Sequence, residues 1–108
     1  MILVIGGRGA GKRCFVLQRL GYPPEAVSSN AANETPVLYG LESLDPLPAL
    51  EDLLEREVVV CQEVGCGVVP LDRTDRDRRE AVGRLCCCLA QRAEAVYRVT
   101  CGIAMRLK

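Results

Sequence analysis

The chain has 108 residues, which is enough for one domain with a modest core. Its 14 basic and 14 acidic side chains cancel, so no net charge draws it to nucleic acid or to an anionic membrane. The apolar opening at residues 1–5 is too short for a signal peptide or a membrane-spanning helix. We therefore expect a single cytoplasmic domain, residues 1–108, with neither nucleic acid nor a membrane as its partner.

The cysteine pattern gives little support to a metal centre. There are seven cysteines, no C-x-x-C pair and no histidine, so a zinc site has few ligands to draw on. We predict no metal site and interpret the cysteines as small buried or half-buried thiols of a reducing cytosol. A redox or metal role is the alternative.

The first third of the chain contains a strand, a glycine-rich turn and a helix. Residues 2–5 form a short apolar run bounded by glycine, which is typical of a strand buried on both faces of a parallel sheet. A helix is predicted at residues 12–20, and Gly21 followed by two prolines ends it. Residues 25–35 are polar and predicted as loop, within which residues 26–28 are the one candidate strand.

Strands and helices alternate in the remainder of the chain. Strands are predicted at residues 36–39, 58–61 and 95–101, helices at 47–55 and 75–93, and a shaped loop at 63–70. Asp72 and Thr74 are cap candidates for the last helix. Its arginines are interpreted as a solvated face, with Arg76 or Arg79 meeting a phosphate or a neighbouring subunit as the alternative. This order predicts an α/β fold with a parallel sheet and helices on its faces.

Residues 6–12, Gly6-Gly7-Arg8-Gly9-Ala10-Gly11-Lys12, fit the phosphate-loop pattern G-x-x-x-x-G-K between a strand and a helix. The glycines let successive backbone N–H groups turn inward as a nest for an anion. The helix start and the lysine complete the site, since the lysine reaches the β- and γ-phosphates. We predict that residues 6–13 bind the phosphates of a nucleotide and that Lys12 is catalytic. A structural glycine turn with an incidental lysine is the alternative.

The residues that usually organise Mg²⁺ are missing. Arg13 stands where a working motif has Ser or Thr, and an arginine cannot ligate a cation although it can neutralise phosphate directly. Gly40 ends the second strand where many phosphate-loop proteins have a metal-organising Asp, and Glu42 and Asp45 are nearby but out of place. Mg²⁺ can still take part, but phosphate binding is better supported than phosphoryl transfer.

The third strand leads into a distinctive loop. Glu63 lies just past its carboxyl end, on the side of a parallel sheet where ligands bind; a solvated loop carboxylate is the alternative. The stretch Glu63-Val-Gly-Cys-Gly-Val-Val-Pro70 closely resembles the Glu-Val-Gly-x-Gly-Ile-Val-Pro hallmark of one family. That family is the bifunctional adenosylcobinamide kinases / adenosylcobinamide-phosphate guanylyltransferases of cobalamin biosynthesis. The Gly-Lys opening, the segment Gly83-Arg84-Leu85 and the ending from Val99 resemble it too.

The resemblance implies a three-layer, RecA-like P-loop NTPase fold with a mainly parallel sheet, reduced in size. It implies a kinase that transfers phosphate from ATP or GTP to the adenosylcobinamide hydroxyl, with the corrinoid accepted near Glu63, Gly65 and Gly67. Since the family forms oligomers, the resemblance also allows a homo-oligomer.

The chain departs from the family between Gly21 and Glu57, where it is shorter and where the family has its nucleophilic histidine. With no histidine in the sequence, the guanylylated-histidine intermediate cannot form, and we expect the guanylyltransferase step to be lost. Two other functions stay open: a non-catalytic nucleotide- or corrinoid-binding relative, and an unrelated small phosphotransferase with a P-loop.

Overall fold

The computed structural model describes residues 1–63 and 72–108, and Gly65 and Gly67 of the predicted substrate-side loop lie outside these residues. Its centre is a six-stranded sheet in the order β2-β3-β4-β1-β5-β6. The strands are β1 (Ile2–Gly6), β2 (Val27–Ser28), β3 (Val37–Tyr39), β4 (Val58–Gln62), β5 (Ala95–Thr100) and β6 (Ile103–Arg106).

β1 lies in the middle of the sheet, parallel to β4 on one side and to β5 on the other. Only β6 runs antiparallel, as the second strand of a hairpin with β5. β3, which Gly40 follows, is separated from β1 by β4, so it is not the direct neighbour of the strand that leads into the glycine loop. This arrangement confirms the predicted reduced, RecA-like α/β fold with a mainly parallel sheet.

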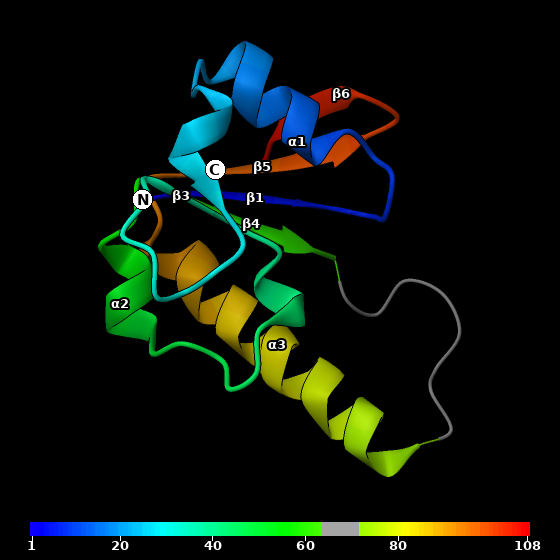
Figure 1. Ribbon diagram of the computed structural model, residues 1–108. Coiled ribbons are helices and arrows are strands. Elements are labelled where there is room, and N and C mark those ends of the chain that lie inside the picture. The colour runs from blue at the N-terminus through cyan, green and yellow to red at the C-terminus, as the bar shows by residue number, and fades with distance from the viewer. Residues whose placement is uncertain (64–71) are drawn as a thin grey trace.

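Helices cover both faces of the sheet, which gives three layers (Figure 1). On one face α1 (Lys12–Cys14) continues into a π-helix, η1 (Phe15–Arg19), and Phe15 and Val16 pack on Val4 and Val60. On the other face α2 (Leu50–Leu54) and α3 (Arg73–Arg92) pack on Leu3 and Val59. β1 and β4 alternate their apolar side chains between the two cores, which is why residues 2–5 and 58–61 are apolar throughout.

Short 3₁₀ turns complete the described chain: η2 (Pro24–Ala26) and η3 (Leu41–Ser43). The predicted helix at 47–55 is correct in place but begins only at Leu50, because Pro48 disfavours the helical conformation of Leu47 and Ala49 is extended, with φ −68° and ψ 148°. The last helix begins earlier than predicted, at Arg73, with the Asp72 side chain accepting a hydrogen bond from the Thr74 N–H at 2.8 Å. β6 was not predicted.

The interpretation of the cysteines as buried or half-buried thiols is wrong for four of the six in the described residues. Cys61 is buried and Cys86 half-buried, but Cys14, Cys87, Cys88 and Cys101 are exposed. The buried stripe of α3 includes Cys86, and the next two residues necessarily turn away from it because successive helical positions face different directions.

Within the described residues, no helix is both long enough and apolar enough to cross a membrane.

Candidate functional site

The glycine loop connects the central strand to the first helix at the carboxyl end of the sheet. Gly9 and Gly11 have positive φ angles of 73° and 97°, which glycine adopts without steric cost. The carbonyl oxygen of Gly7 accepts two bonds, from the Ala10 N–H at 3.2 Å and from the Lys12 ammonium at 2.7 Å. The loop is therefore folded around its own lysine.

Lys12 is only 6% exposed, the one charged residue in the described buried set. Its ammonium is satisfied by the Gly7 carbonyl, since a buried unpaired charge would be costly. The ammonium therefore lies inside the loop. There it can replace its bond to the Gly7 carbonyl with a bond to a phosphate oxygen, which would be stronger because both partners are charged.

A cavity of about 500 Å³ opens beside the loop and is lined by Gly9, Ala10, Gly11, Lys12, Arg13, Cys14, Leu17, Gln18 and Tyr39. Five of the eight predicted phosphate-loop residues thus face one space. Gly6, Gly7 and Arg8 do not line it: Gly6 is buried at the end of β1, and Arg8 is exposed.

Tyr39 closes the cavity from β3, although it is 26 residues beyond Arg13 in the chain. The Arg13 guanidinium carbon lies 6.0 Å from the centre of the Tyr39 ring, within the range of a cation–π contact. Sequence analysis missed Tyr39. Its place as the last residue of a parallel strand, at the edge where ligands bind, is the signal that could have found it.

Glu63 lies beside the start of the loop. Its backbone N–H donates to the Gly6 carbonyl at 2.8 Å, and its carboxylate accepts a charge-assisted bond from Arg98 Nε at 3.1 Å. Arg98 comes from β5, on the other side of β1, so the pair bridges the two neighbours of the loop strand. Arg98 had no sequence signal of its own, because only the sheet order brings it to Glu63.

Glu42 occupies a more central position than its place in the sequence suggested. From η3 its Oε1 accepts the Gln62 N–H at 2.6 Å, and its Oε2 lies 3.6 Å from where a Cβ on Gly40 would be. The carboxylate therefore reaches the end of β3, close to where an Asp at position 40 would begin. Arg78 of α3 holds this segment by donating to the carbonyls of Glu42 and Leu44.

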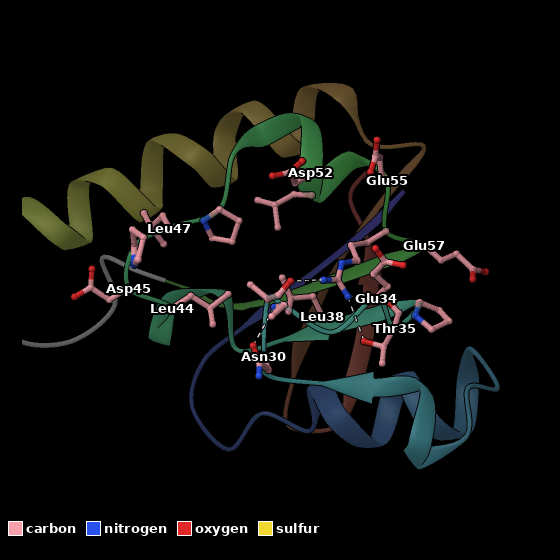
Figure 2. Close-up of a pocket in the computed structure, with 17 residues that line it drawn as sticks. Asn30, Glu34, Thr35, Leu38, Leu44, Asp45, Leu47, Asp52, Glu55 and Glu57 are labelled. Carbon is pink, nitrogen blue, oxygen red and sulfur yellow. Dashed lines mark hydrogen bonds between the residues drawn. The ribbon is translucent and has the colours of Figure 1, made fainter.

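A larger cavity, of about 900 Å³, lies away from the glycine loop, between the segment before β3 and the segment that leads into α2 (Figure 2). Five carboxylates line it: Glu34, Asp45, Asp52, Glu55 and Glu57. Its one guanidinium, from Arg56, is already bonded to the carbonyls of Ala31 and Thr35. Such a surface repels phosphate, so the smaller cavity beside the loop is the candidate nucleotide site.

The C-terminal half of the chain decides the family. Residues 42–107 match the family described as cobinamide kinase / cobinamide phosphate guanyltransferase. The chain belongs to this family. The match confirms the resemblance seen in the sequence and excludes an unrelated phosphotransferase. None of the curated proteins matches the chain.

Membership supports a role of the cobinamide kinase / guanyltransferase type in cobalamin biosynthesis, with a corrinoid and a nucleotide as partners in general terms. The matched residues include Glu63, Arg98 and the hairpin of β5 and β6, but not the glycine loop at residues 6–13. The assignment of the loop therefore depends on its own geometry: the glycine turns, the buried lysine and the adjoining cavity.

Phosphate-loop kinases generally use Mg²⁺, so the loop cavity has to be tested for cation ligands. Mg²⁺ prefers carboxylate and water oxygens in an octahedral arrangement. The described lining residues offer no carboxylate and no aliphatic hydroxyl, and place two cations there instead. Across the described residues, no group of three or more His, Cys, Asp or Glu side chains is arranged to hold a metal. These residues do not fit a resident Mg²⁺.

Proposed function

We propose that the chain is a cobinamide kinase that has kept the phosphate-binding loop and lost the guanylyltransferase step. ATP or GTP would place its phosphates on residues 6–13, and the corrinoid would approach from the side of Glu63. The observation that carries the proposal is the Lys12 ammonium, held at 2.7 Å from Gly7 O beside a cavity of about 500 Å³ in a chain of this family.

In the proposed reaction, the corrinoid hydroxyl oxygen attacks the γ-phosphorus and the bond to the β–γ bridging oxygen breaks. The nucleoside diphosphate leaves with the bonding electron pair, and the hydroxyl proton passes to solvent. Charge builds on the bridging and γ-oxygens, and catalysis consists mainly of positioning and neutralising that charge. Lys12 and Arg13 are the cations within the cavity that can do so.

The guanylyltransferase activity of the family requires a nucleophile on the protein, whereas the kinase step uses the corrinoid hydroxyl. The resemblance assigns that step to a guanylylated histidine, and these 108 residues contain none. We therefore expect the phosphorylated corrinoid to be the final product of this chain.

The test is to incubate the protein with adenosylcobinamide and either GTP or ATP and to follow the corrinoid by mass spectrometry. We expect the gain of one phosphate and no transfer of GMP. Lys12→Ala should slow the reaction by about 100-fold or more, because it removes a preorganised cation from the transferring phosphate.

Lys108→Ala is a matched control, since Lys108 is the only other lysine and its ammonium bonds to the carbonyls of Ala90 and Gln91. Loss of activity in Lys12→Ala but not in Lys108→Ala would support the proposal. Nucleotide binding without any phosphorylated corrinoid would overturn the proposal and favour a second candidate, a non-catalytic binding relative. The observation that favours this candidate is that Arg13 and Gly40 stand in place of the usual metal-organising residues.

A further inference from the structure

The charge inside the loop cavity is unusual for a nucleotide site. Its described lining carries two cations, Lys12 and Arg13, and no carboxylate. The residues between Glu63 and Asp72 cannot add a carboxylate, because the sequence there contains only Val, Gly, Cys, Pro and Leu. A triphosphate entering this space meets two positive charges and, among the described lining residues, neither a carboxylate nor an aliphatic hydroxyl to ligate a divalent cation.

Arg13 occupies the sequence position at which a working phosphate loop has a Ser or Thr metal ligand. It directly follows Lys12, and its guanidinium carbon is 6.0 Å from the centre of the Tyr39 ring, which favours a position over the ring. A guanidinium is always charged and presents several N–H donors in a fixed plane, which matches phosphate oxygens. It also repels Mg²⁺, so one residue both replaces and excludes the metal.

The acids that follow β3 and β4, Glu42 and Glu63, are bonded elsewhere. Glu42 accepts from the Gln62 N–H at 2.6 Å and from the Ser43 hydroxyl at 3.2 Å. Glu63 accepts from Arg98 at 3.1 Å. Neither carboxylate is among the described residues that line the cavity, and both are engaged in these bonds.

We infer that this site binds the metal-free triphosphate in preference to its Mg²⁺ complex, with the Arg13 guanidinium taking the charge-neutralising role of the metal. The inference rests on the proposed nucleotide site and specifies the form of the ligand that the site accepts. It concerns binding, so it can be tested separately from turnover.

The experiment measures GTP and ATP affinity by calorimetry, once with excess Mg²⁺ and once with EDTA, for the native chain and for Arg13→Ser. The native chain should bind more tightly in EDTA than with Mg²⁺. Arg13→Ser should lose about tenfold or more of its affinity in EDTA, the usual scale for a hydrogen bond to a charged group. It should also become dependent on Mg²⁺, because serine restores an oxygen ligand.

Arg19→Ser is the matched control, since Arg19 is exposed, lies on the same helical segment and does not line the cavity. It should behave as the native chain does. Native binding that is as tight or tighter with Mg²⁺, or equal loss in the two variants, would overturn the inference and leave the nucleotide site intact. Absence of binding in both media would overturn the proposed function, and the inference with it.

Discussion

Cys61 of β4 and Cys86 of α3 form a thiol pair across the interface between the sheet and the helix, with 3.4 Å between their sulfur atoms. Their hydrogen bond is the main cause that raises the pKa of Cys61, and burial adds to it. The same bond lowers the pKa of Cys86, against the opposing effects of burial and of the Glu42 carboxylate. Cys61 therefore keeps its proton to a higher pH than an ordinary thiol, and Cys86 loses its proton at a lower pH.

This asymmetry predicts different alkylation profiles. Since only the thiolate reacts, Cys86 should be alkylated by iodoacetamide at a lower pH than an ordinary thiol, and Cys61 should stay unreactive into the alkaline range. Fragment mass spectrometry of chains alkylated at a series of pH values reads each cysteine separately. In Cys61→Ala the Cys86 profile should move to higher pH, because only the opposing effects remain. An unchanged Cys86 profile in that variant would contradict the assignment.

Single residues differ in how far the sequence could predict them. The loop residues from Gly9 to Arg13 could be placed together because they are neighbours in the chain and their glycine spacing determines the turn. Tyr39 and Arg98 could not, since each reaches the site only through the order of strands in the sheet. The role of Glu42 could not be predicted either, because its carboxylate reaches back toward Gly40 only in the folded chain.

At the scale of elements, the apolar runs of β1 and β4 were enough to predict buried parallel strands, and Asp72 marked the start of α3. β6 was missed. Cys101 and Gly102 have φ angles of 50° and 75°. They form a two-residue hairpin turn of the type in which both central residues need a positive φ. Asn, Asp or Gly is typical of the first position, so the cysteine there gave no signal from which the hairpin could be predicted.

The junction of β1 with the loop gives a prediction about stability. A Cβ added at Gly6 would lie 2.5 Å from the Val99 carbonyl oxygen of β5, and paired backbone strands cannot separate to make room. Gly6→Ala should therefore lower the free energy of unfolding by about 1–3 kcal/mol, as overpacking does. Urea denaturation measures this loss.

Gly7→Ala is the natural comparison, because a Cβ there meets nothing within 4 Å. Its unfolding free energy should stay within about 0.5 kcal/mol of the native value, the usual range for a surface substitution. Equal denaturation midpoints for Gly6→Ala and Gly7→Ala would show that the close approach between β1 and β5 does not limit this position.

At the scale of the whole molecule, the sheet order places the glycine loop against the hairpin from the far end of the chain. The Gly102 N–H donates to the Ala10 carbonyl at 2.8 Å, and a Cβ at Gly11 would lie 3.2 Å from the Gly102 Cα. The family match covers the hairpin but not the loop, so this contact joins the part of the chain that carries the family likeness to the loop that we propose binds phosphate.

A ligand that orders the loop should therefore slow hydrogen exchange in the hairpin turn. With nucleotide at about ten times its Kd, the Gly102 amide should exchange about tenfold more slowly, since binding stabilises only the closed form. The Leu107 amide bonds to the Val96 carbonyl at 2.7 Å, at the other end of the same hairpin, and should change much less. In Lys12→Ala the protection at Gly102 should be lost. Exchange at Gly102 that stays constant while calorimetry shows the site saturated would mean that loop and hairpin open independently, despite the bond between them.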